Sequence, residues 1–236
     1  RDLKGNHDRL LVSHKDRIEV IEMNDKSTRL HVIPLGFIEN DVALNLLLSN
    51  QADSKERERH AVWHRVPSIC LLIDHPKLGW VLVDTGSNDD AMEGYWPDSA
   101  RLKTPLIRTK KDLLLYRLDQ LGLTPSDIDC LILTHMHLDH AGGLYHFSNT
   151  KAGQKIIVHS EEIREALYDT FMSDAPIVNG YIKSDFVGVD GIHFDPIDDS
   201  IKMADDLELI WLPGHTAGTL AVKVDLKNHG TIIYTS

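Results

Sequence analysis

The sequence predicts one layered α/β domain with mixed β-sheets. Short apolar segments typical of buried strands recur along most of the 236 residues, and a few amphipathic helical segments lie between them in one continuous pattern. No stretch resembles a linker between domains, and the length suits a single large domain with a well-buried core. We therefore expect only an N-terminal extension with the first strand, 1–28, followed by the main domain, 29–236.

Strands are predicted where apolar and polar residues alternate, or where apolar residues run continuously between turn residues. The turn at 74–79 contains Pro76 and Gly79 and separates two such runs, which predicts a β-hairpin. The polar stretch 49–61 predicts an exposed loop or short helix. The predicted strands are 18–23, 29–35, 66–73, 80–84, 128–133, 155–158, 207–212, 219–224 and 231–235.

Two helices are predicted between these strands, after a long ordered loop at 87–107. The first, 109–121, has a capping box formed by Thr109 and Asp112 and stops at Gly122. The second begins near Ser160, and its apolar face is expected to comprise Ile163, Leu167 and Phe171. The segment 174–206 is acidic and loop-rich, with room for short strands.

Composition and charge exclude several classes of protein. The formal net charge of −11 opposes binding to nucleic acid, and no apolar run approaches the roughly 20 residues of a membrane-spanning helix. Cys70 and Cys130 each lie in an apolar run, which predicts buried free thiols and a reducing, cytoplasmic location. We expect a small-molecule substrate and no nucleic-acid or membrane partner, while the oligomeric state is not indicated.

Four candidate metal ligands fall within six residues at the end of the predicted strand 128–133. His135 and His137 are two residues apart, so in extended backbone they project to the same side and can bind one cation. Asp139 and His140 follow where the chain turns, and can face a second cation. Imidazole and carboxylate ligands without thiolate favour zinc or a similar ion in an open catalytic site. Gly142 and Gly143 allow close backbone packing at this turn.

Two further residues are weaker candidates. His215 in Gly214-His215-Thr216 follows a strand, and is either a structural turn residue or the third imidazole of the first metal site. Asp84 in VLVDTG is either an ordinary turn aspartate or a carboxylate that orients a ligand histidine.

Three separated motifs now resemble those of the metallo-β-lactamase superfamily. THMHLDHAGG at 134–143 is similar to its HxHxDH signature, and LVDTG at 82–86 and PGHTAG at 213–218 stand where its other markers lie. The resemblance covers about residues 29–236 and implies an αββα sandwich, two mixed β-sheets flanked by helices. Within the superfamily, the sequence HMHLDHAGG and the long segment before it most resemble those of the N-acyl-homoserine lactonases.

The resemblance also implies roles for the candidate residues. His135, His137 and His215 would hold the first of two divalent metal ions, most simply Zn²⁺, and Asp139 and His140 the second. Asp84 would orient a ligand histidine. Asp139 would act catalytically by passing a proton to the leaving oxygen.

One departure from the family concerns the end of the chain. The family has a bridging aspartate just after the strand that here reads TIIYTS, and a further histidine later; both would lie beyond Ser236. We therefore expect the second half of the sandwich to be incomplete, with weak binding of the second metal and slow hydrolysis by this chain.

The implied reaction is opening of a lactone ester, such as an N-acyl-homoserine lactone, by attack of a metal-bound hydroxide. A hydrolase of the same fold that acts on a thioester, β-lactam or phosphodiester is the first alternative. A metal-binding fragment without catalysis is the second. A di-iron redox protein is disfavoured, because such proteins resemble HxExDH, with Glu where this chain has His137.

Overall fold

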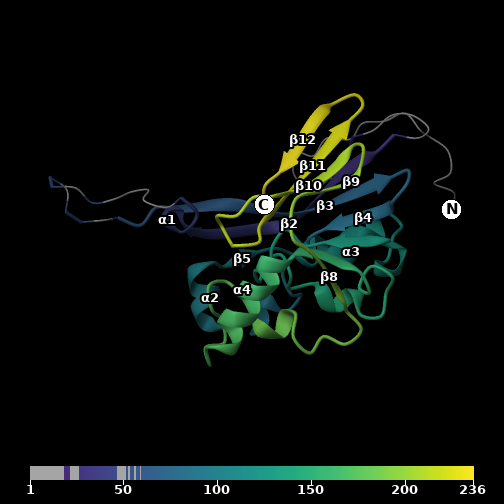
Figure 1. Cartoon of the computed structure of the whole chain (residues 1–236). Coiled ribbons are helices and arrows are strands. Elements are labelled where there is room, and N and C mark those ends of the chain that lie inside the picture. Colours follow the sequence, from purple (N-terminus) through teal and green to yellow (C-terminus); the bar gives the residue numbers. More distant parts are fainter. Residues whose placement is uncertain (1–18, 22–26, 47–51, 53, 56, 59) are drawn as a thin grey trace.

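The computed structural model describes residues 19–21, 27–46, 52, 54–55, 57–58 and 60–236. Two β-sheets pack face to face, and the helices lie against the larger sheet (Figure 1). The predicted α/β class is confirmed. The helices of the described residues pack mainly against the larger sheet, so together with the two sheets they form three layers of the expected four-layer sandwich.

The larger sheet is mixed, as predicted. Its strands run in the order β1-β2-β3-β4-β6-β7-β8, and β5 pairs with β2. Neighbours from β1 to β4 are antiparallel, whereas β4, β6, β7 and β8 are parallel. The strands are β1 Glu19–Ile21, β2 Arg29–Asp41, β3 Trp63–His75, β4 Gly79–Val83, β5 Leu106–Ile107, β6 Cys130–Ile132, β7 Ile156–His159 and β8 Phe194–Ile197.

The smaller sheet is antiparallel throughout its described strands, which corrects the expectation of two mixed sheets. Its order is β12-β11-β10-β9. The connections 205–206, 212–219 and 227–229 are too short for the crossover that a parallel pair requires. The strands are β9 Ile201–Ala204, β10 Leu207–Trp211, β11 Leu220–Leu226 and β12 Gly230–Tyr234.

The helices differ in detail from the prediction. The expected loop 87–107 contains helix α2 (Asp98–Lys103) and strand β5. The expected helix 109–121 is divided, because extended Leu113 (ψ 142°) separates a capped 3₁₀ turn from α3. The helices are α1 Val42–Asn45, α2, α3 Leu114–Gln120 and α4 Ser160–Phe171, with 3₁₀ turns at Ala91–Glu93, Lys110–Asp112, Pro125–Asp127, Leu144–Phe147 and Lys183–Asp185.

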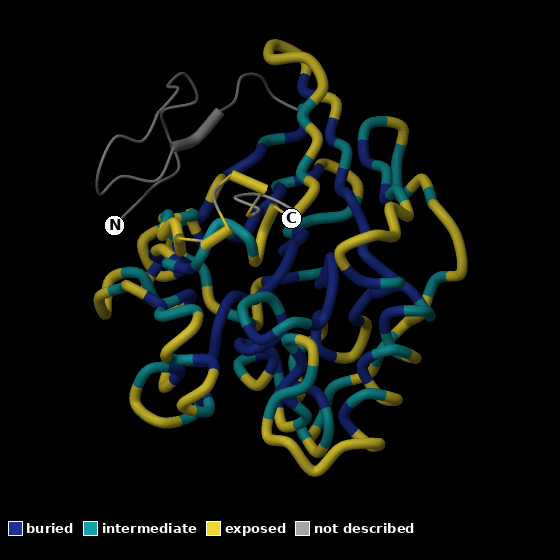
Figure 2. Tube along the Cα trace, turned by 90° about the vertical axis from the view of Figure 1, so that its left-hand side faces the viewer, coloured by how far each residue is buried: buried dark blue, intermediate teal, exposed yellow. Residues whose placement is uncertain are grey.

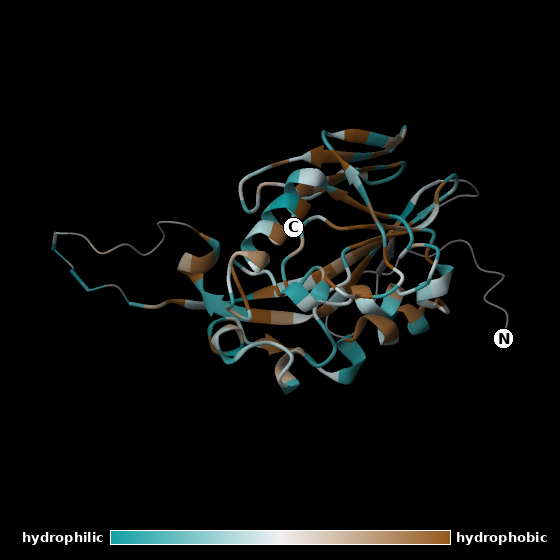
Figure 3. Ribbon diagram, turned by 60° about the horizontal axis from the view of Figure 1, so that its bottom comes forward, coloured by the Kyte–Doolittle hydropathy of each residue, from teal (hydrophilic) through white to brown (hydrophobic). Residues whose placement is uncertain are grey.

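Both faces of the larger sheet are buried. Within β4, Leu82 packs toward the helices, whereas Val81 and Val83 pack toward the smaller sheet. Leu131 and Ile132 of β6 divide in the same way. Figure 2 shows this buried interior and Figure 3 its apolar strands. Burial on two sides explains why these strands are continuous apolar runs in the sequence.

Helix α4 buries a different face from the one predicted. Leu167 and Phe171 are exposed, and only the partly buried Ile163 packs against the core as expected. The residues that α4 buries are Glu162, Ala166 and Thr170. The helix is turned this way because the Glu162 carboxylate has hydrogen-bond partners beneath it, described below.

The remaining predictions concern cysteines and chain segments. Cys70 and Cys130 are buried free thiols, as predicted. Most of 1–28 and part of the predicted loop 49–61 lie outside the described residues. Within the part of the chain that the structure describes, no helix has the length and apolarity needed to cross a membrane.

Candidate metal centre

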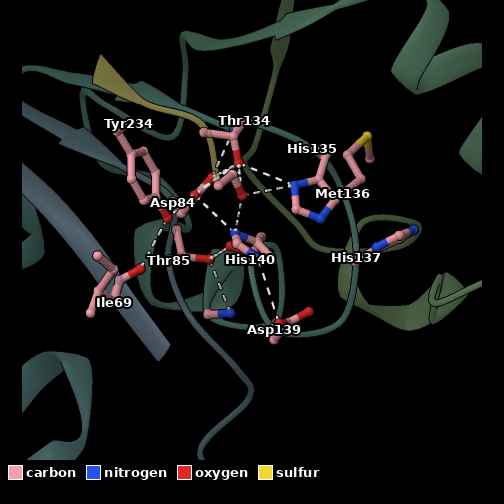
Figure 4. Close-up of polar contacts among 12 residues, drawn as sticks. Ile69, Asp84, Thr85, Thr134, His135, Met136, His137, Asp139, His140 and Tyr234 are labelled. Carbon is pink, nitrogen blue, oxygen red and sulfur yellow. Dashed lines mark hydrogen bonds and ion pairs between the residues drawn. The ribbon is translucent and has the colours of Figure 1, made fainter. Parts of the chain in front are cut away.

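Segments distant in sequence meet at one edge of the two sheets. The strands β4 and β6 are parallel neighbours, so Asp84 and the segment 134–140 follow their carboxyl ends side by side. The β10–β11 connection brings His215 to the same place, and the Leu220 N–H donates to the Thr134 carbonyl at 2.8 Å. Sheet topology therefore assembles the predicted residues, of which Figure 4 shows Asp84, His135, His137, Asp139 and His140.

The three histidines predicted for the first metal lie together. One ring nitrogen from each of His135, His137 and His215 is within 4.8 Å of the others. His137 Nδ1 and His215 Nε2 are 3.1 Å apart. His135 Nε2 is buried and has no hydrogen-bond partner among the described residues. A buried ring nitrogen without a partner is costly, so this arrangement favours a bound ligand.

These three imidazoles are suited to metal binding because they are neutral at pH 7. Burial lowers the pKa of His135 well below its usual value and that of His137 to about 3, and it also lowers the pKa of His215. A neutral imidazole offers the lone pair that a metal ion requires.

Asp139 and His140 form a separate charged pair beside this cluster. Asp139 Oδ2 lies 3.5 Å from His140 Nε2, and Asp84 Oδ2 lies 2.9 Å from His140 Nδ1. Burial lowers the pKa of His140, but the two carboxylates outweigh it and raise the pKa to about 10. Burial raises the pKa of Asp139, but the neighbouring His140 outweighs this effect and lowers the pKa to about 2. His140 is therefore protonated in the metal-free protein, and a second cation would displace this proton on binding the ring.

Asp84 is fully buried and orients several groups at once. Its carboxylate accepts hydrogen bonds from the Thr134 N–H (2.8 Å), the Thr134 hydroxyl (2.9 Å) and the Tyr234 hydroxyl (3.3 Å), in addition to its contact with His140 (Figure 4). Its backbone has φ 64°, an uncommon value for a residue other than glycine. The structure thus brings the Asp84 carboxylate into contact with His140, as the predicted orienting role requires, and that role stays a prediction.

Gly142 and Gly143 allow the turn after His140 to pack closely against the segment that follows strand β4. A Cβ atom on Gly143 would lie 2.4 Å from the Thr85 carbonyl oxygen. The Thr85 N–H and hydroxyl both donate to the His140 carbonyl, each at 2.8 Å. The close packing predicted for Gly142 and Gly143 is confirmed.

We expect Gly142→Ala to destabilise the fold by about 2 kcal/mol, because the new methyl group overpacks this turn. The added Cβ would lie 2.4 Å from the Asn88 nitrogen and 2.6 Å from the Leu138 carbonyl oxygen. Urea unfolding measures the change. Gly214→Ala is the control, since its Cβ meets no atom within 4 Å. Equal stabilities of the two variants would contradict this packing.

The metal-free protein is expected to lose stability as the pH falls from 7 to 5. The pKa of His137 is about 3 in the folded protein and 6.5 when unfolded, so only the unfolded chain gains a proton in this window. His137 alone should remove roughly 2 kcal/mol. Thermal unfolding in the presence of a chelator measures the effect, and stability that rises toward pH 5 would contradict it.

The sequence did not indicate the residues that support His137 from the other side. Gly180 has φ +92°, and a Cβ there would lie 2.8 Å from the His137 ring. The Tyr181 ring packs against His137 with centroids 4.7 Å apart, and the Leu138 N–H donates to the Gly180 carbonyl at 3.0 Å. Residues 179–181 form a short irregular turn, so no periodicity or motif marked them.

The donor set fits the predicted metal ions. His135, His137 and His215 would hold one ion, since three neutral imidazoles converge and one buried nitrogen among them is free. Three protein ligands are the usual set in catalytic zinc sites. Asp139 and His140, held by Asp84, would hold the second. Three of the five predicted ligands would thus hold the first ion and two the second. These roles stay predictions.

Comparison with known proteins gives consistent results. A family model described as the Metallo-beta-lactamase superfamily matches residues 65–233. The N-acyl homoserine lactonase AiiB of Agrobacterium fabrum is 38% identical over 89 residues, covering 37% of this chain and 31% of that protein. The N-acyl homoserine lactonase of Bacillus cereus is 25% identical over 177 residues, covering 72% and 63%. The chain therefore spans less than two thirds of the length of these relatives.

A solved structure shares the fold. It is an N-acyl homoserine lactone hydrolase with the product N-hexanoyl-L-homoserine bound at its catalytic metal center. The TM-score is 0.69 with 23% sequence identity, and the match covers 89% of this chain and 76% of that chain. At this identity the likeness shows a common architecture.

Proposed function

The chain belongs to the metallo-β-lactamase superfamily, and on this premise we propose that the whole protein hydrolyses the lactone ring of N-acyl homoserine lactones. The predicted family and fold are confirmed, and a hydrolase acting on small esters is consistent with the relatives. The names of the relatives AiiB and the Bacillus cereus lactonase support the narrower substrate.

One observation carries the proposal. Three neutral imidazoles lie with ring nitrogens within 4.8 Å of one another, directly beside the Asp139–His140 pair. Such a set combines a metal site with a carboxylate that can exchange protons with the substrate. When bound there, two divalent metal ions, which we propose to be zinc, supply Lewis acidity and lower the pKa of water.

The residues of the chain then perform the proton transfers. Because its pKa is about 2, Asp139 is ionised at neutral pH and can accept a proton from the attacking water. The same carboxyl returns this proton to the ring oxygen when the ester C–O bond breaks, giving an alcohol and a carboxylate. His140 orients Asp139 from 3.5 Å, and Asp84 holds His140 in turn.

A pH-stat assay with N-hexanoyl-homoserine lactone tests the proposal. We expect the zinc-loaded protein to release acid faster than the chelated protein, and faster with the lactone than with a thioester, a β-lactam or a phosphodiester. Faster turnover of one of these other compounds would show that it, and not the lactone, is the preferred substrate. Zinc binding without any hydrolysis would favour the metal-binding fragment instead.

A further inference from the structure

Glu162 is a fully buried carboxylate near the start of helix α4. It is not one of the predicted metal ligands. Its Oε1 accepts hydrogen bonds from the Met136 N–H at 2.7 Å and from the Tyr181 hydroxyl at 3.1 Å. Its Oε2 accepts one from the Thr216 hydroxyl. One side chain thus contacts three segments that are separate in sequence.

The partners of Glu162 adjoin the three clustered histidines. Met136 lies between His135 and His137, and Thr216 follows His215 directly. The Tyr181 ring packs on His137 with centroids 4.7 Å apart. Any displacement of the Glu162 carboxylate would therefore be transmitted to the loops that carry these imidazoles.

Further contacts hold the same loops against α4. Glu165, one turn later, accepts a hydrogen bond from the Ala217 N–H at 2.7 Å, and its Oε2 lies 3.2 Å from the Tyr181 hydroxyl, which shares its single proton between Glu162 and Glu165. A Cβ on Gly218 would lie 2.2 Å from the Glu162 nitrogen, so the loop after His215 touches the helix backbone. The start of α4 thus contacts both the segment 134–140 and the β10–β11 connection, which carry the three histidines.

We propose that Glu162 is a positioning residue that fixes the separation of His137 and His215 and thereby sets the metal affinity of the three-histidine cluster. The inference rests on the metal site of the proposed function but not on its substrate. Hydrogen bonds from outside the ligand set commonly change metal affinity by about 10–100-fold when they are removed.

The chemistry of the bridge allows position to be separated from charge. All three partners of Glu162 are donors, but the Thr216 hydroxyl can instead donate to Thr219, whose Oγ1 is 2.7 Å away, and accept from an amide. Glu162→Gln can therefore keep the bridge without the charge, whereas Glu162→Ala removes it. Glu161→Ala is the matched control, because among the described residues the Glu161 carboxylate pairs with Arg164 on the surface of the same helix.

Co²⁺ titration of the metal-free protein, followed by visible absorption, tests the proposal without requiring hydrolysis. We expect Glu162→Ala to weaken Co²⁺ binding at least tenfold and to change the absorption of the bound ion. Glu162→Gln should stay within about threefold of the parent, and Glu161→Ala should match the parent. Parent-like affinity of folded Glu162→Ala, or equal losses in Glu162→Ala and Glu162→Gln, would overturn the proposal.

If Glu162→Ala does not fold, Thr216→Val decides the matter, since it removes one hydroxyl and leaves the Met136 and Tyr181 contacts in place. Weaker Co²⁺ binding with a changed spectrum supports the bridge, and unchanged binding overturns it. A parent protein that binds Co²⁺ but opens no lactone would refute the proposed substrate while leaving this test intact. A parent that binds no Co²⁺ would refute both.

Discussion

Replacing His137 with alanine is expected to weaken metal binding about 10³-fold and to reduce hydrolysis to the same extent. Structural zinc sites have apparent binding free energies of about 10–16 kcal/mol, so the loss of one of three imidazoles should remove about 4 kcal/mol. The lost nitrogen lies 3.1 Å from His215 Nε2 in the cluster. Competition titration with a chromophoric zinc chelator measures the affinity.

His229→Ala is the matched control for this substitution. His229 is exposed in the connection between β11 and β12, outside the site. It should bind zinc and hydrolyse substrate as the parent does. Parent-like zinc content and turnover in His137→Ala would show that His137 is not a metal ligand. The assignment of three ligands to the first ion and two to the second would then be wrong.

Asp84→Asn is expected to weaken binding of the second metal about 100-fold and to lower stability by about 3 kcal/mol. Asparagine tolerates the positive φ of 64° at this position, so the backbone is not the cause. The cause is the loss of a buried charge. The asparagine amide has only one acceptor atom, so it cannot accept hydrogen bonds from both Thr134 and His140 as the carboxylate does. Without the negative charge, the pKa of His140 should fall.

Two measurements distinguish these effects of Asp84→Asn. Urea unfolding of the metal-free protein reports the stability, and NMR titration of His140 reports its pKa. Asp127→Asn serves as the control, because Asp127 caps an exposed 3₁₀ turn through Thr124 and is not one of the site residues. A variant with parent-like stability and an unchanged His140 pKa would show that Asp84 does not orient this histidine.

Much of the fold followed from local patterns. The hairpin of β3 and β4 was predictable because its apolar runs flank Pro76 and Gly79. The short helix α2 was not, since six residues between prolines carry too little periodicity. Helix α4 was located correctly but rotated, because its buried face is decided by the hydrogen-bond partners of Glu162 and not by its apolar residues.

The candidate site divides in a similar way. His135 to His140 are contiguous in sequence, so one strand end could reveal them. His215 was ambiguous alone, since only the packing of the β10–β11 connection onto Thr134 brings it to the cluster. Glu162, Gly180 and Tyr181 could not be predicted, because their contacts with the histidine loops depend on tertiary packing across 19 to 54 residues.

Anomalous diffraction at the zinc edge from crystals of the zinc-loaded protein tests the central claim most directly. We expect one peak within about 2.0–2.1 Å of ring nitrogens of His135, His137 and His215, and a second peak of lower occupancy between Asp139 and His140. Peaks only at other surface residues, with His137 still hydrogen-bonded to His215, would contradict the account.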